Sequence, residues 1–235
     1  MKTLVFIPAR GGSKSIPMKN LALFDGKPLI KHAIKMGVYA LGGDFVHPVI
    51  STDSPSIKAY AELCAETITH NRPEGLSGDD SNVFDAFKHF WMSERDNHDL
   101  WDVCVFLQPT YPLVERWHID ACLQALKLDQ GGASAQTIIP VPHDFHEYNQ
   151  RETAGGNFIT FVDRDIRADC YNKQRKPTRY AFGGVLVFSI SEALEQETLF
   201  PSPSIGIHIP PLPIHDIDSA ADLALANLLR KEGVI

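Results

Sequence analysis

The sequence has no apolar run that approaches the roughly 18 residues of a membrane-spanning helix. Residues 1–10 contain a short apolar stretch, but that stretch meets Pro8 and Arg10 and is too short for the core of a secretory signal. We therefore expect a cytoplasmic protein without a membrane partner. Internal repeats and low-complexity segments are also missing, and the 235 residues are expected to form a single domain, residues 1–235.

Basic charge and cysteine are both scarce. Lys and Arg number 22 against 29 Asp and Glu, so the formal net charge is −7. Binding to a nucleic-acid backbone requires a basic face, and this acidic balance predicts that nucleic acid is not a partner. The cysteines lie far apart with no CxxC pair, which favours reduced thiols over disulfides or zinc ligands. They are Cys64, Cys104, Cys122 and Cys170.

Strand-like and helix-like segments alternate along the chain. This alternation predicts an α/β fold with a mostly parallel sheet and helices on both of its faces. The expected strands are residues 3–8, 49–51, 67–69, 102–107, 135–141 and 185–189. The expected helices are residues 28–41, 55–66, 82–92, 116–128 and 219–231.

Residues 142–180 differ from the rest of the chain. They are polar, rich in Arg, Asp and His, and only residues 158–162 resemble a strand. We interpret the segment as an insertion into the main sheet, serving either as a lid or as a dimerisation arm. His143 and His146 lie three residues apart, but without a further ligand an exposed polar segment is favoured over a metal site.

The loop after the first strand, IPARGGSKSIPMKN at residues 7–20, carries the strongest functional signal. In open α/β sheets, ligands bind outside the carboxyl ends of the strands. The loop offers three cations, two glycines and a hydroxyl: Arg10, Lys14, Lys19, Gly11, Gly12 and Ser13. Such a set suits a triphosphate, although neither the GxxxxGK[ST] nor the GxGxxG spacing is present. A solvated basic loop with a glycine turn is the alternative.

This loop resembles the N-terminal signature of the acylneuraminate cytidylyltransferases, the CMP-sialic acid synthetase family, which reads approximately [IL]-x-A-R-x-x-S-K-G-[IL]-x-x-K-N. Ser15 replaces the usual glycine. Four later blocks resemble family segments in the same order: STD at 51–53, RPEGLSGDDSN at 72–82, LQPTYPL at 107–113 and HDIDSAADL at 215–223. The resemblance therefore spans nearly the whole chain.

The resemblance implies a Rossmann-like nucleotide-diphospho-sugar transferase fold and a homodimer. The reaction that it implies joins CTP to a nine-carbon 2-keto sugar acid, giving a CMP-sugar and pyrophosphate. In that reaction the anomeric hydroxyl of the sugar attacks the α-phosphate, and Mg²⁺ is required.

The resemblance implies four kinds of role for residues of this chain: nucleotide binding, sugar binding, metal binding and catalysis. The nucleotide would be bound by Ala9, Arg10, Gly11, Gly12, Ser13, Lys14, Lys19, Asn20, Arg72 and Ser81. The sugar would contact Gln108, Thr110 and Tyr111. Mg²⁺ would be held by Asp216 and Asp218, and the catalytic residues would be Arg10, Lys19 and Asp218.

Several of these roles have structural alternatives. If residues 215–218 form a strand, Asp216 and Asp218 point to one side, and two carboxylates with phosphate oxygens suit Mg²⁺. Asp218 or Ser219 could instead cap the last helix, with Asp222 in its first turn. Asp53 could bind ribose or cap the helix that begins near Pro55, and Arg72 could belong to a surface salt bridge.

The acceptor side departs from the family pattern. Tyr111 and Val114 stand where QPTSPLR has serine and arginine, and Gly183-Gly184 replaces an Asn-Gly pair. The acceptor could be legionaminic, pseudaminic or another nonulosonic acid. Loose candidates for its carboxylate, or for an interface, are Arg167, Lys173, Arg175 and Arg179. The alternatives are a transferase for another nucleotide or sugar, such as keto-deoxyoctonate, and a catalytically silent nucleotide-binding relative.

Overall fold

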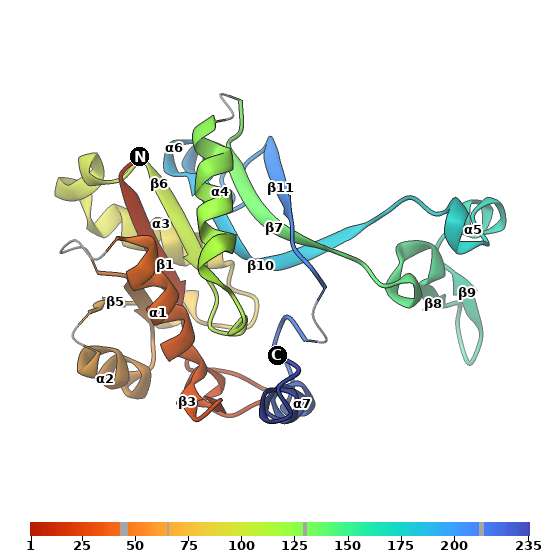
Figure 1. Ribbon diagram of the computed structural model, residues 1–235, viewed down its shortest axis with the longest axis horizontal. Coiled ribbons are helices and arrows are strands. Elements are labelled where there is room, and N and C mark those ends of the chain that lie inside the picture. The colour runs from red at the N-terminus through yellow and green to blue at the C-terminus, as the bar shows by residue number, and fades with distance from the viewer. Residues whose placement is uncertain (43–46, 65, 129–130, 212–213) are drawn as a thin grey trace.

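A computed structural model describes residues 1–42, 47–64, 66–128, 131–211 and 214–235. Its centre is a seven-stranded sheet in the order β11-β7-β10-β6-β1-β4-β5 (Figure 1). The strands are β1 (Thr3–Pro8), β4 (Val49–Thr52), β5 (Ile68–Asn71), β6 (Val103–Leu107), β7 (Ser134–Pro140), β10 (Tyr180–Ser189) and β11 (Ser204–His208). Only β10 runs antiparallel to its neighbours β6 and β7, so the predicted mostly parallel sheet is confirmed.

Helices cover both faces of the sheet, as predicted. One face carries α1 (Leu29–Ala40), α2 (Pro55–Leu63) and α4 (Arg116–Leu128), and the other carries α3 (Val83–Ser93) and α6 (Ile190–Glu195). Successive side chains of β1 alternate between the two layers: Val5 packs with α1, whereas Phe6 meets Phe87 of α3 with ring centroids 5.5 Å apart. Because both faces are buried, the strand sequences are almost continuously apolar.

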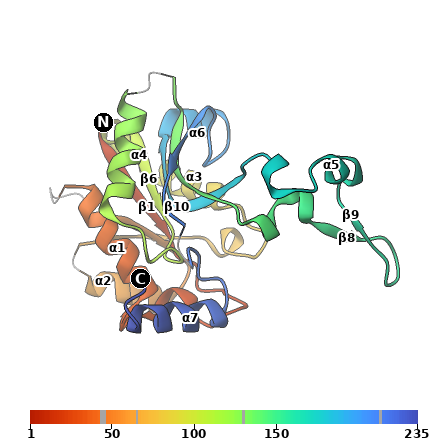
Figure 2. The same ribbon diagram turned by 45° about the vertical axis from the view of Figure 1, so that its right-hand side comes forward.

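The C-terminal helix α7 (Ala220–Lys231) packs beneath the sheet against the N-terminal hairpin of β2 (Leu23–Phe24) and β3 (Lys27–Pro28) (Figure 2). A third apolar cluster joins them, and its members include Phe24, Leu29, Ile217 and Ala226. The Asn227 amide also donates to the carbonyl of Leu23 over 3.0 Å. This packing brings residues 214–219, which precede α7, back to the loop after β1.

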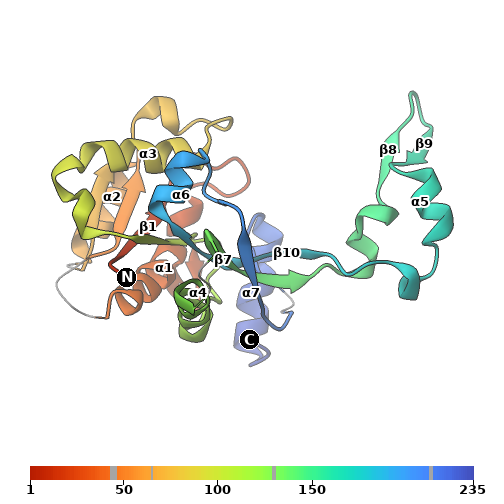
Figure 3. The ribbon, with the colours of Figure 1, turned by 90° about the horizontal axis from the view of Figure 1, so that it is seen from above.

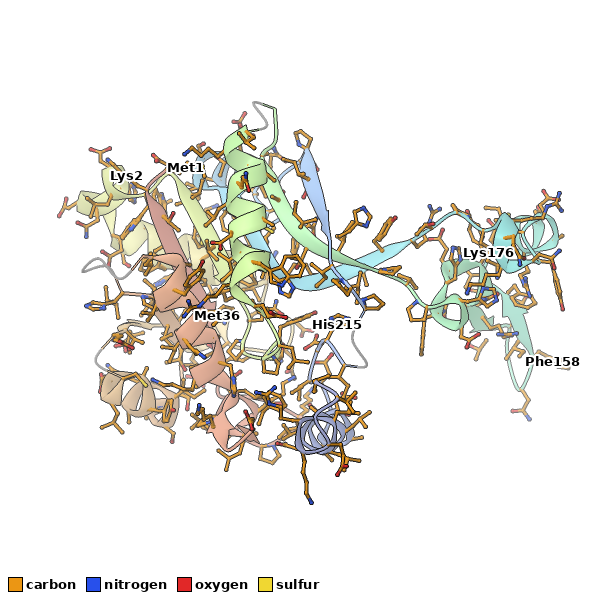
Figure 4. All side chains as sticks on the ribbon, in the orientation of Figure 1. Met1, Lys2, Met36, Phe158, Lys176 and His215 are labelled. Carbon is orange, nitrogen blue, oxygen red and sulfur yellow. The ribbon has the colours of Figure 1, made fainter. Side chains whose placement is uncertain are left out.

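Residues 141–179 leave the sheet between β7 and β10 and form an arm that projects away from the main body (Figures 1 and 3). The arm contains β8 (Arg151–Thr153), β9 (Ile159–Phe161) and α5 (Arg164–Asp169). It occupies the segment that the sequence marks as an insertion. Figure 4 shows Phe158 near its far end, well away from His215 in the body.

Some elements were not expected from the sequence. β11 is an edge strand with alternating half-buried and exposed residues, α6 has six residues, and both are too short for a clear periodic signal. β10 begins at Tyr180 rather than 185, because Gly183-Gly184 lies within the strand, where its register with β7 shifts, and does not end it. The expectation of a strand at residues 215–218 was wrong, since these residues have no sheet partner.

Candidate functional site

A cavity of about 540 Å³ opens at the carboxyl ends of β1 and β6. From β1 the chain moves to β4 and β5 on one side and then to β6 on the other, so the cavity lies at the switch point of the sheet. Most predicted site residues line it: Arg10, Gly12, Ser13, Lys14, Lys19, Asn20, Arg72, Ser81, Gln108, Thr110, Asp216 and Asp218. Ala9, Gly11 and Tyr111 do not belong to its lining.

The loop after β1 is held in place by residues that follow β4. The Asp53 carboxylate accepts the backbone N–H of Gly11 over 2.8 Å. A Cβ at position 11 would lie 2.8 Å from the Cβ of Ser54, so glycine is needed for this close approach. Asp53 does not cap α2, because Ser54 is the N-cap and accepts from the N–H of Ile57.

The loop cations converge on a carboxylate that sequence reasoning missed. Asp79 lies 3.2 Å from Arg10 and 2.5 Å from Lys14, and the hydrogen bond from Lys14 is the main reason why the pKa of Asp79 is lowered. The signal was present, since Asp79 lies in the RPEGLSGDDSN block. These cations are thus already gathered where a triphosphate would need them.

Arg72 and Asn20 are buried in the wall of the cavity. Arg72 is 5% exposed, and its guanidinium donates through Nε and Nη2 to the carbonyl of Leu76, while burial lowers its pKa. This placement rules out the surface salt bridge considered for Arg72. The Asn20 amide donates to the carbonyl of Arg10 over 2.9 Å and so holds the loop against the cavity.

Lys19 and Asp218 form an ion pair in the lining of the cavity. The ammonium of Lys19 lies 3.1 Å from Oδ1 of Asp218; the lysine side chain is 16% exposed and the aspartate 74%. Ser15, the residue that replaces the family glycine, donates to the backbone carbonyl of Asp218 over 2.5 Å. The N-terminal loop and the C-terminal segment are therefore joined directly at the site.

Asp216 lies deeper than Asp218. Its Oδ1 is buried and has no hydrogen-bond partner among the described residues. Burial is the main cause of its raised pKa; the hydroxyls of Thr110 and Tyr111 oppose that rise, and the charge of Asp218 adds to it. Buried carboxylate oxygens normally accept a hydrogen bond, and this one accepts none within the described part of the chain. Together with the neighbouring carboxylate of Asp218, it provides a pair of ligands that suits a divalent cation.

The sequence suggested that Asp216 and Asp218 point to one side because they alternate along a strand. In the structure, strand alternation is not what brings them together. The segment is fixed instead by Ile217, whose side chain is buried in the third apolar cluster and whose N–H donates to the carbonyl of Thr110 over 2.9 Å. Asp222 belongs to the N-terminal capping box of α7. One of its carboxylate oxygens accepts hydrogen bonds from the backbone N–H and the hydroxyl of Ser219, each over 2.8 Å.

Tyr111 has a different environment from its neighbours Gln108 and Thr110. Its ring packs on the Cα of Gly184 and makes an edge contact with Phe182, with centroids 5.4 Å apart. Burial, together with the charge of Asp216, raises the pKa of its hydroxyl. Tyr111 therefore packs against β10 and does not line the cavity.

Two of the arm cations that the sequence left undecided, Arg167 and Arg179, have structural partners. Arg179 pairs with Glu147 over 2.7 Å within the arm, and Arg167 lies over the rings of Phe161 and Tyr171. Residues 143–147 are mostly exposed, as expected, but His146 is buried and its Nε2 is hydrogen-bonded to the carbonyl of Pro177. Across the described residues, no group of three or more His, Cys, Asp or Glu side chains is arranged to hold a metal. Phe84, Phe87, Phe90 and Trp91 are buried against the sheet, as their spacing predicted.

The chain matches the cytidylyltransferase family model over residues 4–193. The chain belongs to this family. It is 29% identical over 215 residues to an N-acylneuraminate cytidylyltransferase of Streptococcus agalactiae, an alignment that covers 86% of this chain and 47% of that protein. It is 28% identical over 237 residues to a pseudaminic acid cytidylyltransferase of Campylobacter jejuni, with 98% and 97% of the two chains covered.

Relatives differ in length, and the chain spans about half the length of the streptococcal cytidylyltransferases that it matches. Its fold matches a solved CMP-2-keto-3-deoxy-manno-octonic acid synthetase complexed with CTP. The TM-score is 0.68 at 17% identity, and 99% of this chain and 100% of that chain are covered. The nucleotidyltransferase architecture is thereby confirmed. Among the described residues, none of the helices is long and apolar enough to cross a membrane.

Proposed function

We propose that this cytidylyltransferase transfers CMP from CTP to a sialic-acid-like 2-keto sugar acid, with release of pyrophosphate. One observation carries the proposal. Lys19, near one end of the chain, and Asp216 and Asp218, near the other, line the same cavity as the cationic loop. The cavity provides cations for a triphosphate and carboxylates for a metal. The names of the relatives support the choice of cytidine and of a nonulosonic acid.

Arg10, Lys14 and the glycine-rich loop are proposed to bind the triphosphate. Its phosphate oxygens would replace Asp79 as the partner of these cations, and the cations would stabilise the negative charge that builds up on the departing pyrophosphate. Lys19 would contact the α-phosphate, and attack of the anomeric hydroxyl there breaks the bond to pyrophosphate. Asn20, Arg72 and Ser81 would surround the cytosine and ribose, while Gln108 and Thr110 would meet the sugar.

Asp216 and Asp218 are proposed to hold Mg²⁺. The buried, unpartnered Oδ1 of Asp216 fits this role, because it lacks the donor that a buried carboxylate oxygen normally has. Bound Mg²⁺ would neutralise charge at the α-phosphate and favour ionisation of the attacking hydroxyl. Two carboxylates leave several positions of an octahedral cation for phosphate oxygens and water.

The experiment is release of pyrophosphate by the purified protein with Mg²⁺, CTP and a panel of sugar acids that includes N-acetylneuraminic, legionaminic, pseudaminic and 3-deoxy-manno-octulosonic acids. We expect release with CTP and a nine-carbon acid, and much weaker release with UTP or GTP. Preference for UTP or GTP would overturn the cytidine assignment. CTP binding without release for every acceptor would favour the silent relative instead.

We also propose a cytoplasmic homodimer formed through the arm. The cysteines are free, as expected in a reducing compartment, and the arm exposes large apolar side chains while it contacts little of its own main body. Phe145, Phe158 and Tyr171 are each at least 70% exposed. A second copy of the chain is the partner that would cover them.

A further inference from the structure

The carboxylate of Asp79 bridges two cations of the glycine-rich loop. Its Oδ1 lies 3.2 Å from Nη1 of Arg10, and its Oδ2 lies 2.5 Å from Nζ of Lys14. All three residues line the cavity. Each carboxylate oxygen therefore meets one cation, which is also how two oxygens of a phosphate group would meet the same pair.

Asp79 is held next to these cations by the residues that precede it. The guanidinium of Arg10 also donates to the carbonyl of Gly78 over 2.8 Å. Ser77 is buried, and its hydroxyl donates to the carbonyl of Pro73 over 3.1 Å. The backbone that carries Asp79 is therefore tied both to the loop after β1 and to its own segment, so the carboxylate starts from a fixed place.

The contact itself is open to exchange with a ligand. The side chains of Arg10, Lys14 and Asp79 are 35%, 84% and 44% exposed. Ion pairs with this much exposure stabilise a protein only slightly, because water and salt screen the charges. A triphosphate brings several negative charges to the same two cations, so it is able to displace a single carboxylate.

Asp79 carries its negative charge in the empty site. The hydrogen bond from Lys14 is the main cause of its lowered pKa, and the charges of Lys14 and Arg10 act in the same direction. An ionised carboxylate at this place competes with phosphate for the cations as long as they remain within its reach.

We infer that Asp79 is an internal competitor of the triphosphate, which occupies Arg10 and Lys14 in the empty site, gives way to CTP and pairs with both cations again when pyrophosphate leaves. The inference rests on the proposed function and concerns the regulation of that same site. Its consequence is that CTP and pyrophosphate bind more weakly than the cations alone would allow, which favours release of the product.

The test is Asp79→Asn, which removes the charge and keeps the size of the side chain. Isothermal titration calorimetry measures the binding of CTP, inorganic pyrophosphate and CMP in the presence of Mg²⁺ and without an acceptor. We expect CTP and pyrophosphate to bind about two- to fivefold more tightly, as the loss of one exposed ion pair predicts. CMP should bind as it does to the wild type, because the proposed function places its single phosphate at Lys19.

Asp80→Asn is the matched control. Asp80 follows Asp79 in the chain and is also exposed, but it does not line the cavity. It forms no ion pair with any residue that the structure describes. The variant changes the net charge by the same amount, and it should bind all three ligands as the wild type does.

Lys14→Met separates competition from general repulsion between the carboxylate and the phosphates. Competition acts through the cations, so Asp79→Asn should strengthen pyrophosphate binding less in a Lys14→Met background than in the wild-type background. Repulsion does not need Lys14 and would give the same gain in both backgrounds.

Three outcomes would overturn the inference. They are unchanged or weaker binding of CTP and pyrophosphate in Asp79→Asn, an equal gain in Asp80→Asn, and equal gains with and without Lys14. Weaker binding would make Asp79 a ligand of the nucleotide or its metal. Failure of the proposed function is distinguishable, because it requires the wild type to release no pyrophosphate from CTP with any acceptor, whereas these binding measurements need no turnover.

Discussion

At the scale of single residues, the site depends on charges that have been brought close together and partly removed from water. Lys19 shows this best, since its side chain is mostly buried and its ammonium is 3.1 Å from the Asp218 carboxylate. If Lys19 contacts the α-phosphate as proposed, its charge is already in place before the substrate binds, and little reorganisation is needed when charge builds up on the phosphate.

Lys19→Ala is expected to lower the rate of pyrophosphate release about a hundredfold or more, because a fixed positive charge next to the α-phosphate is lost. The measurement is steady-state kinetics with CTP, together with the melting temperature, which should change little. Lys88→Ala is the control, since Lys88 forms a similar ion pair with Glu197 over 3.0 Å outside the cavity. Unchanged kinetics in Lys19→Ala would contradict the assignment of Lys19.

At the scale of elements, buried His70 connects β5 to β4 and to α3 through polar contacts. His70 contacts the hydroxyl of Ser51 over 3.0 Å and Nδ1 of His89 over 2.9 Å. Burial, followed by the charges of His89 and Arg72, lowers the pKa of His70 to about 4. Arg72 directly follows β5 and lines the cavity, so these contacts also support the part of the site that is proposed to bind the nucleotide.

The sign of the pH effect follows from this shift. Between the usual histidine pKa of 6.5 and about 4, folded His70 is neutral while unfolded His70 takes up a proton. Stability is therefore expected to fall as the pH falls through this range, by about 3 kcal/mol in total. Denaturant unfolding at several pH values measures it, and His70→Asn should flatten the dependence. The exposed His208 provides the control variant His208→Asn, and an equal slope in the wild type and His70→Asn would contradict the prediction.

α7 provides a second test at this scale. Ser219 and Asp222 form a capping box, so Ser219→Ala is expected to lower the free energy of unfolding by about 1 kcal/mol. Urea denaturation measures the change. Ser189→Ala is the matched control, because Ser189 stands at the N-cap of α6 without a capping hydrogen bond from its side chain. A larger loss in the control than in Ser219→Ala would argue against the cap.

At the scale of the whole molecule, the arm is the feature that a single copy does not explain. It extends from β7 and β10 far beyond the body (Figure 3). Several of its large apolar side chains, Phe145, Phe158 and Tyr171 among them, are exposed to solvent. Apolar patches of this kind on a folded chain are typical of interaction surfaces.

We expect light scattering to give twice the mass of the chain. Phe158→Asp, a change at a residue that is 78% exposed on the arm, should shift the population towards monomer, because a charge at the interface would be buried without a partner. Leu63→Asp is the control, since Leu63 is 85% exposed at the end of α2 in the body. A wild type that is monomeric at all concentrations would contradict the role of the arm.

Much of the fold could be predicted from local pattern. The strand at residues 3–8 and the helix at 116–128 agree with the structure in both bounds, because periodicity and apolar runs depend on near neighbours. Short or exposed elements such as β11 and α6 gave no comparable signal. The strand predicted at residues 185–189 begins at Tyr180, and the glycine pair at 183–184 lies inside it, with close neighbours that come from distant parts of the chain.

For the site, the sequence by itself determined which chemical groups are available: the cationic loop after the first strand, the QPT segment and the aspartates near the C-terminus. Only the tertiary structure decided how they meet. Asp216 and Asp218 reach the loop because Ile217 and α7 pack against the N-terminal hairpin, and Asp79 faces Arg10 and Lys14 across the cavity. The ring of Tyr111 packs against β10 because Gly184 leaves room for it. These contacts join residues up to about 200 positions apart, and they form only when burial of apolar surface fixes the distant segments together.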